Sequence, residues 1–226
     1  ISTRRQFNRI FRSGFFLRYH LMLLFHESSF LRNYGTGFNF EGDVWVIKTD
    51  GSGLELYRGR LKMVDSDAKS VIADFHRDDY QTYIGEAVEP DSYLKSPYFR
   101  PDGYPQGIYR VGPLARLNVC KTMGSPLADE ALKAYRETAG GTANSSFFYH
   151  YARLIEILAS TELMRVFLND DSILGTNVRA TGGINHRHAV GVSEAPRGTL
   201  FHEYAVDETG LLEYVNMIIA TGQNNL

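Results

Sequence analysis

The sequence contains almost no cysteine: Cys120 is the only one in 226 residues. One cysteine excludes an internal disulfide framework, and it excludes a zinc or iron–sulfur site built on cysteine pairs of this chain alone. An excess of positive charge is also absent, because 24 Lys and Arg stand against 26 Asp and Glu. The chain as a whole is therefore not a polyanion binder. The redox compartment stays open, and a reducing cytosol fits best.

Long apolar runs are absent as well. The most apolar stretch, residues 15–25, is eleven residues long and contains Arg18 and His20, whereas a membrane-spanning helix needs about twenty apolar residues. We therefore expect no membrane span. The composition that remains is 43% hydrophobic, 22% charged and 13% aromatic, which indicates a globular protein of one large or two small domains.

The two ends of the sequence are unusual. The first residue is Ile1 rather than Met, and the apolar run 218–220 leads into a turn-like cluster that stops at Leu226. We expect residues 1–226 to be an internal fragment of one larger domain.

The N-terminal segment is basic, with Arg4, Arg5, Arg9, Arg12 and Arg18 and no acid before Glu27. Residues 2–7 look like a twin-arginine export motif, but arginines interrupt the following apolar core and no small-residue cleavage site follows. Helical spacing instead predicts an amphipathic helix, whose apolar residues are Phe7, Ile10, Phe11, Phe15, Met22 and Phe25. It is interpreted either as a buried helix, for example against a partner subunit, or as a nucleic-acid or lipid-surface helix.

The remaining pattern predicts an α+β fold of helices with small antiparallel β-hairpins. β-branched and aromatic runs with intervening turns predict a small meander over 43–75 and a hairpin over 199–220. Residues 85–113 hold five of the seven prolines, interleaved with tyrosines, and are predicted to form an ordered Pro/Tyr-rich loop. An aromatic stacking platform for nucleic acid is the alternative there.

A helical pair is predicted over 125–168. Ser125 and Pro126 are typical of an N-cap and the first helical position, and Gly140 with Gly141 ends the first helix. Asn144 or Ser145 is expected to cap the second helix, on which Arg153 and Glu156 are spaced as an ion pair. Residues 179–198 are glycine-rich and are predicted to be a loop that approaches another group closely.

Few residue patterns indicate chemistry. His186 and His188 suggest a metal pair, but without a third ligand a surface loop is the alternative interpretation. Cys120 is interpreted as a buried hydrophobe, since no histidine lies near it in sequence. The sequence also has no phosphate-binding loop and no nucleophile elbow.

Arg197 is the strongest candidate, because it lies between Pro196 and Gly198. This placement fixes the backbone on one side and leaves the guanidinium accessible to an anion or a small polar ligand. An ion pair with Glu194 is the structural alternative.

At this point the residues resemble a known family. The run 190–202, VGVSEAPRGTLFH, is similar to a signature of the large subunit of nickel–iron hydrogenases, and 219–225, IATGQNN, is similar to the segment that follows it in the cytoplasmic, cofactor-reducing group. The runs GEAVEP (85–90), SYLK (92–95), YRVGPLARLN (109–118) and SSFFYHYARLIE (145–156) resemble the bidirectional, NAD-reducing subgroup. The resemblance covers about 43–226 and implies part of the mostly helical fold of that large subunit.

The resemblance implies roles for three residues. Arg197 would be the catalytic arginine over the nickel–iron centre, where it contacts an iron-bound cyanide, and Pro196 would line the same pocket. Thr221 would donate to the other cyanide. Such donors make physical sense, because the lone pairs of a buried cyanide otherwise stay unsatisfied.

The resemblance also implies groups that this chain cannot hold. The family binds a NiFe(CN)2(CO) centre through four cysteines in two C-x-x-C motifs, and this sequence contains neither motif nor the carboxylate proton relay beside the first. We therefore expect no metal ligands here and an inactive fragment. In the parent protein, H2 would be the substrate. The partners would be an iron–sulfur small subunit, together with NAD-reducing diaphorase subunits that hold FMN, in the cytoplasm and without nucleic acid.

Three alternatives stay open. The parent protein could be a viologen- or deazaflavin-reducing hydrogenase, which shares the motifs of Arg197 and Thr221. It could be a non-catalytic homologous scaffold, such as a quinone-reductase subunit. The chain could also be a binding module that acts through its basic N-terminal helix.

Overall fold

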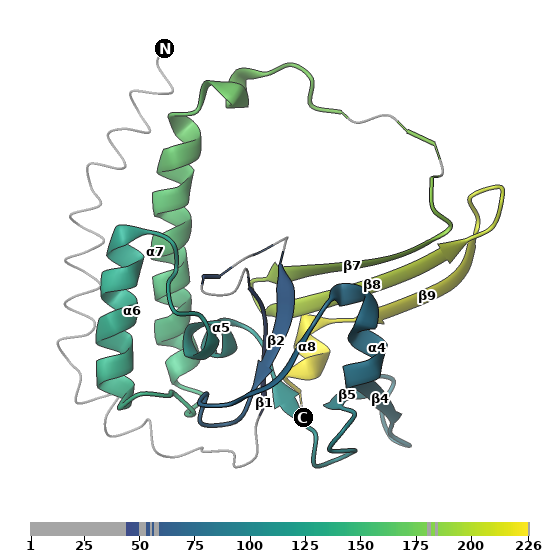
Figure 1. Ribbon diagram of the computed structural model, residues 1–226, viewed down its shortest axis with the longest axis horizontal. Helices are drawn as coiled ribbons and strands as arrows, with labels where there is room; N and C mark the ends of the chain where they lie inside the picture. The colour runs from purple at the N-terminus through teal and green to yellow at the C-terminus, as the bar shows by residue number, and fades with distance from the viewer. Residues whose placement is uncertain are drawn as a thin grey trace.

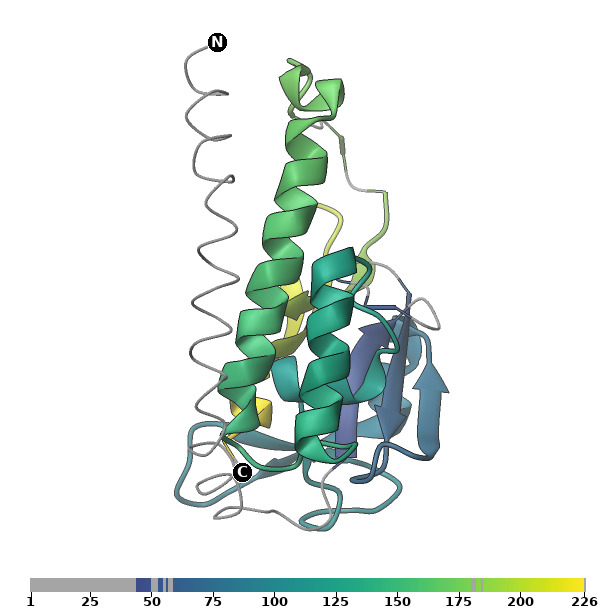
Figure 2. The same cartoon turned by 90° about the vertical axis from the view of Figure 1, so that its left-hand side faces the viewer.

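The computed structural model describes residues 44–49 (backbone), 53, 54, 56, 59–179, 182, 183 and 185–225. Helices and small sheets form separate halves: α6 (Pro126–Ala139) and α7 (Phe148–Leu168) run side by side along one side, and the strands occupy the other (Figures 1 and 2). The α+β fold class is confirmed.

The first sheet contains a meander. Strands β1 (Val44–Thr49), β2 (Arg60–Val64) and β3 (Val71–Phe75) are antiparallel in the order β3-β2-β1, and β6 (Tyr109–Arg110) pairs in parallel with β1. Alternate side chains of β2 point inward, so that Leu61 and Met63 are buried. The strand β6 brings the chain to the start of helix α5 (Pro113–Val119), next to the site described below.

The prediction of a continuous loop over 85–113 is wrong. After the short helices η1 (Arg77–Asp79) and α4 (Tyr80–Tyr83), strands β4 (Ile84–Val88) and β5 (Lys95–Phe99) form an antiparallel hairpin in which Glu86 faces Pro97. Among the described residues this sheet has two strands, so no further strand pairs with the outer edge of β5, where the Phe99 amide donates to Gly107 O. A proline on such an edge removes no ladder hydrogen bond, which is why Pro97 is compatible with a strand.

Helix α6 has the predicted bounds, but its N-terminus is capped differently. Ser125 makes no side-chain cap hydrogen bond to its own helix. Instead Glu162, on α7, accepts hydrogen bonds from the Leu127 and Ala128 amides at 3.1 and 3.0 Å and from Ser125 Oγ at 2.7 Å. A carboxylate at this helix end satisfies unpaired N–H groups and complements the helix dipole. At the other end Gly140 has the expected left-handed conformation, with φ 72°.

The predicted cap of α7 is also wrong. The helix begins at Phe148 rather than after Asn144 or Ser145, and Phe147 occupies the N-cap position without a side-chain hydrogen bond. The segment 143–145 is held elsewhere: Asn118 bonds the Ala143 backbone in both directions, at 2.9 and 3.0 Å.

The prediction of a loop over 179–198 is wrong for its second half. Strand β7 (His188–Ala195) pairs with β8 (Gly198–Val206), which pairs with β9 (Leu212–Ile218), so the expected hairpin is part of a three-stranded antiparallel sheet. The helix η2 (Asp171–Leu174) begins the long connection from α7 to the far end of β7 (Figure 1). The short helix α8 (Ala220–Gln223) follows β9.

Two buried clusters form the core. One joins the sheets and includes Leu61, Phe75, Tyr109 and Phe201. The other lies between α5, α6 and α7 and includes Leu117, Leu132, Tyr135 and Ile155. The site lies where these two halves meet.

The export motif and the amphipathic helix predicted for residues 2–25 lie outside the described residues. Within the part of the chain that the structure describes, no helix combines the length and the apolar character needed to cross a membrane.

Glu162→Ala is expected to lower the free energy of unfolding by about 1–2 kcal/mol, because the Leu127 and Ala128 amides lose their acceptor. Urea unfolding followed by circular dichroism measures the change. Glu137→Ala, at an exposed position of α6, is the matched control and should change the free energy by less than about 0.5 kcal/mol. Equal effects of the two substitutions would disprove the capping role of Glu162.

Candidate functional site

The candidate site is a β-turn between two paired strands. The ladder of β7 and β8 continues to the pair Ala195 and Gly198, so that Pro196 and Arg197 form a two-residue connection. Gly198 has φ 142°, and a Cβ at this position would overlap the Val111 side chain. Only glycine fits here. The sequence predicted open space on the Gly198 side of Arg197. The backbone there instead forms a tight turn that packs against residues 111–112.

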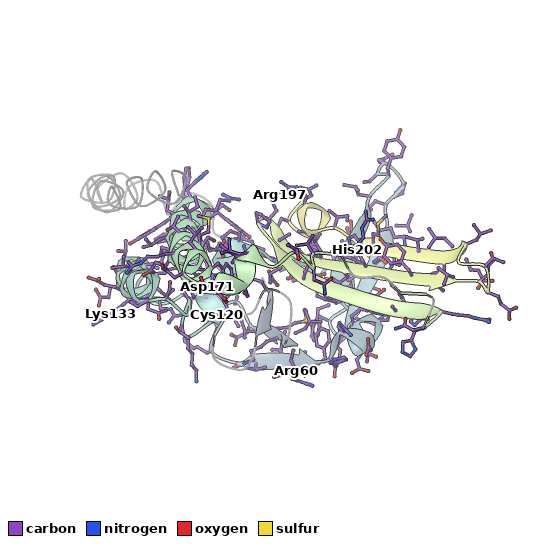
Figure 3. The ribbon with its side chains drawn as sticks, turned by 90° about the horizontal axis from the view of Figure 1, so that it is seen from above. Arg60, Cys120, Lys133, Asp171, Arg197 and His202 are labelled. Carbon is purple, nitrogen blue, oxygen red and sulfur yellow. The ribbon has the colours of Figure 1, made fainter. Side chains whose placement is uncertain are left out.

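The structure brings together the three residues that sequence analysis selected. Arg197 Nε donates to Thr221 Oγ1 at 3.0 Å, and Pro196 precedes Arg197 in the same turn. All three are exposed. Figure 3 shows Arg197 at the end of the sheet nearest the helices, with His202 farther along the strands. The turn and the start of α8 therefore present one polar edge.

The carbonyl oxygens of the turn are all bonded to side chains. Arg116, on α5, donates from Nη1 to Ala195 O at 2.9 Å and from Nη2 to Pro196 O at 3.3 Å. Asn224 Nδ2 donates to Arg197 O at 3.0 Å. The side of the turn that faces the protein is therefore fixed by donors from two other segments.

Arg116 is the residue that sequence analysis missed. Its side chain is 3% exposed, and its guanidinium also donates to Glu156 at 2.5 and 2.9 Å and to Glu194 at 2.7 Å. Burial alone would lower the pKa of Arg116, but the two carboxylates outweigh it and hold this pKa above its ordinary value. The guanidinium therefore stays charged. Nothing in the helical pattern around position 116 separates this arginine from a surface one.

Two expected ion pairs are replaced by this network. Glu194 bonds Arg116 and the buried Thr199 Oγ1, at 2.6 Å, rather than Arg197. Glu156 likewise bonds Arg116, while Arg153 lies over the Tyr149 ring, with its Cζ 5.5 Å from the ring centroid. Among the described residues, the Arg197 side chain bonds Thr221 instead.

Helix α8 is docked by two amides that follow Thr221. Gln223 is 1% exposed, accepts from Tyr109 Oη at 2.9 Å and donates to Thr199 O at 2.6 Å. Asn224 accepts from the Val111 amide at 3.0 Å while it donates to Arg197 O. A buried amide such as that of Gln223 is costly unless it is paired, and these bonds together fix the place of Thr221 beside the turn.

Residues 186–188 carry the two histidines that suggested a metal pair in the sequence. His186 is exposed, and His188 begins β7, where its Nε2 lies 2.7 Å from Glu203 Oε1. Cys120 is buried among the helices, and burial raises the pKa of its thiol to about 12. Among the described residues, no group of three His, Cys, Asp or Glu side chains could hold a metal ion.

A shallow hollow of about 270 Å³ lies on β7 and β8 away from the turn. Gly191, Val192, Ser193, Leu200 and His202 line it. The hollow offers two aliphatic side chains, one hydroxyl and one imidazole but no Lys or Arg side chain to attract an anion, so the polar edge at Arg197 is the better candidate.

A second buried carboxylate fixes the other end of the sheet. Glu203 accepts hydrogen bonds from Tyr80 Oη at 2.6 Å and from Gln81 Nε2 at 2.7 Å, in addition to its contact with His188. Burial raises the pKa of Glu203, but the bonds from Tyr80, His188 and Gln81 outweigh it and lower this pKa below its ordinary value of 4.5. Burial and the bond to Glu203 raise the pKa of Tyr80 to about 12.

Comparison with known proteins relates the chain to hydrogenase subunits. It is 43% identical over 183 residues to one subunit of the F420-non-reducing hydrogenase vhu of Methanococcus voltae, a match that covers 80% of this chain and 43% of that protein. It is 41% identical over 179 residues to the NAD-reducing hydrogenase HoxS subunit beta of Cupriavidus necator, covering 78% of this chain and 36% of that protein. The chain thus spans less than half the length of these relatives.

Solved structures agree. An NAD+-reducing [NiFe]-hydrogenase in the H2-reduced state superposes with a TM-score of 0.83 at 35% identity, over 92% of this chain and 47% of that one. The Ni-Fe-Se hydrogenase of D. vulgaris Hildenborough shares the fold, with a TM-score of 0.61 at 18% identity, over 90% of this chain and 47% of that one. No family model matches the chain. The chain is therefore homologous to hydrogenase subunits.

Acid is expected to destabilise the protein partly through Glu203. Because its folded pKa is depressed, the stabilisation is fully present above about pH 4.5 and is lost as the pH falls through the folded pKa. In Glu203→Gln, the free energy of unfolding should therefore fall less steeply with acid below pH 4.5. Urea unfolding at a series of pH values measures both slopes. Glu213→Gln, on the exposed part of β9, is the control. Parallel curves for wild type and Glu203→Gln would refute this prediction.

Proposed function

We propose that the chain is an internal part of the catalytic large subunit of a [NiFe] hydrogenase that interconverts H2 with protons and electrons. Electrons would leave through an iron–sulfur small subunit to FMN-containing, NAD-reducing subunits in the cytoplasm. The TM-score of 0.83 to an NAD+-reducing [NiFe]-hydrogenase and the 41% identity to part of an NAD-reducing hydrogenase support this type.

The observation that carries the proposal is the contact between Arg197 and Thr221. These residues come from sequence runs 24 positions apart, each of which resembles a hydrogenase motif, and the fold places them on one polar edge. Within the described residues, the Arg197 Nη groups make no hydrogen bond, while Nε is held by Thr221. The outward donors are therefore available to an anionic ligand.

The side chains fit the outer part of a nickel–iron site. Arg197 would donate to one iron-bound cyanide and place a positive charge beside the reacting hydrogen, Thr221 would donate to the other cyanide, and Pro196 would line the pocket. The NiFe(CN)2(CO) centre itself supplies the heterolytic cleavage of H2. Its cysteine ligands would have to come from outside these 226 residues, so we propose that the fragment alone is inactive.

The far end of α7 supports a larger domain. Apolar side chains point outward around the end of this helix and η2, where an isolated domain would carry polar residues. They are Ile157, Leu163, Met164, Val166, Phe167, Ile173 and Leu174, each more than 40% exposed. We propose that further parts of the large subunit cover this end.

A second candidate is an F420-non-reducing hydrogenase. The 43% identity to a subunit of the vhu hydrogenase favours it, and its catalytic use of Arg197 and Thr221 would be the same. The electron acceptor therefore has to be decided by assay.

The coding sequence on both sides of this segment is expected to encode a C-x-x-C motif before residue 1 and another after residue 226. The complete matured enzyme should then reduce NAD+ with H2. An enzyme that reduces a viologen dye with H2 but does not reduce NAD+ would favour the second candidate. Flanking sequence without both motifs would contradict the catalytic proposal and favour a non-catalytic scaffold.

In the same complete enzyme, Arg197→Lys is expected to slow H2 oxidation by about 10²-fold with nickel content unchanged, because lysine cannot keep the fork of donors. Gas-phase H2 uptake and metal analysis measure the two quantities. Arg187→Lys is the control, since Arg187 pairs with Glu208 at an exposed site just beyond the ends of β7 and β8. Wild-type turnover in Arg197→Lys would rule out the proposed role.

A further inference from the structure

Three consecutive carbonyl oxygens, those of Ala195, Pro196 and Arg197, accept hydrogen bonds from side chains of other elements. In a two-residue turn between strands, such carbonyl oxygens normally form hydrogen bonds with water. We propose that Arg116 and Asn224 are positioning residues that set the conformation of this turn and so aim the Arg197 side chain.

The guanidinium of Arg116 is fully used. Its five N–H donors have five acceptors: two oxygens of Glu156, one of Glu194, and the carbonyls of Ala195 and Pro196. The paired contact with Glu156 fixes the plane of the guanidinium, and the opposite edge then meets the turn at one orientation. A lysine has three donors on a flexible stem and cannot make these five bonds.

The charges of the cluster agree with this role. One guanidinium is shared by the Glu156 and Glu194 carboxylates, so the formal sum of these three groups is one negative charge. Among the described residues of this cluster, the negative sum has the sign that favours a cation in the adjoining turn, which carries Arg197.

Asn224 acts from the opposite side. Its Nδ2 holds Arg197 O, and its Oδ1 accepts from the Val111 amide. A Cβ on Gly112 would lie 2.7 Å from Arg197 O, so the backbone of residues 111–112 closes on the turn. Asn224 directly follows the helix that carries Thr221. The backbone and the side chain of Arg197 are therefore both tied to one short segment.

The catalytic consequence of this positioning rests on the proposed function, but the positioning itself does not. It can be measured in the complete subunit as amide hydrogen exchange of residues 195–200 and as the mobility of Arg197 Nε by NMR. A merely structural arginine would, when replaced, speed exchange throughout both core clusters. Replacing a positioning arginine would speed exchange in the turn residues 195–200 more than in the core clusters.

Arg116→Lys is expected to speed exchange at residues 195–200 by about tenfold or more, the equivalent of losing about one hydrogen bond, and to free Arg197 Nε. Arg136→Lys is the matched control, because Arg136 also bonds backbone carbonyls, those of Leu117 and Cys120, but away from the turn. It should leave residues 195–200 unchanged.

If Arg116→Lys does not fold, Asn224→Ala tests the same proposal. It should loosen the Arg197 side chain while the buried Arg116 cluster stays intact, and Asn225→Ala, at the exposed neighbouring position, should not. A folded Arg116→Lys or Asn224→Ala with an unchanged turn overturns the proposal. So does loosening that is uniform over the whole chain.

The complete enzyme separates the two proposals. Arg116→Lys and Asn224→Ala should lower kcat for H2 oxidation with normal nickel content, in step with the loosening of the turn. If the turn loosens and turnover does not change, the positioning stands and the catalytic role of Arg197 fails. If the turn does not loosen, the positioning fails whatever the turnover.

Discussion

The buried guanidinium of Arg116 is the interaction on which the architecture depends. A charge with 3% exposure is costly unless it is paired and hydrogen-bonded. Here the partners come from different elements: Glu156 from α7, Glu194 from β7, and two carbonyls from the turn. The helical half and the sheet half therefore meet at one charged point with a fixed geometry. An arrangement of the halves that moved either carboxylate away would leave Arg116 donors without acceptors. The observed arrangement is favoured for this reason.

Close backbone packing completes that arrangement. Residues 111–112 and 197–198 approach so closely that a Cβ on Gly112 or Gly198 would collide with the other segment. Asn224 bonds to both segments, and Gln223 bonds to the neighbouring residues Tyr109 and Thr199. The strand that leads into α5, the hairpin turn and helix α8 thus form one unit, although they lie far apart in sequence. Thr221 reaches Arg197 because this unit is rigid.

Local signals in the sequence were sufficient for some elements and not for others. Pro126 and Gly140 mark the ends of α6 because proline and glycine act through their own backbone preferences. The acceptor at that helix end, Glu162, lies 34 residues from Ala128 and has no local signature. Strand β7 was missed because glycines suggested a loop. Arg197 could be selected from its neighbours in sequence, whereas Arg116 acquires its role through tertiary contacts alone.

The distribution of contacts around the turn bears on whether this edge is functional or only structural. Arg116, Glu194 and Gln223 are buried and Glu156 is half-buried, and the contacts that each makes with other segments account for these positions. Arg197 is exposed, and within the described residues its side chain makes one hydrogen bond, to another exposed residue. A scaffold would gain little from three side-chain hydrogen bonds to the backbone of an exposed turn. Preorganised donors do gain from such support when they must meet charge that develops at a fixed point. Under the proposed function, this support would hold the Arg197 guanidinium in place for its ligand.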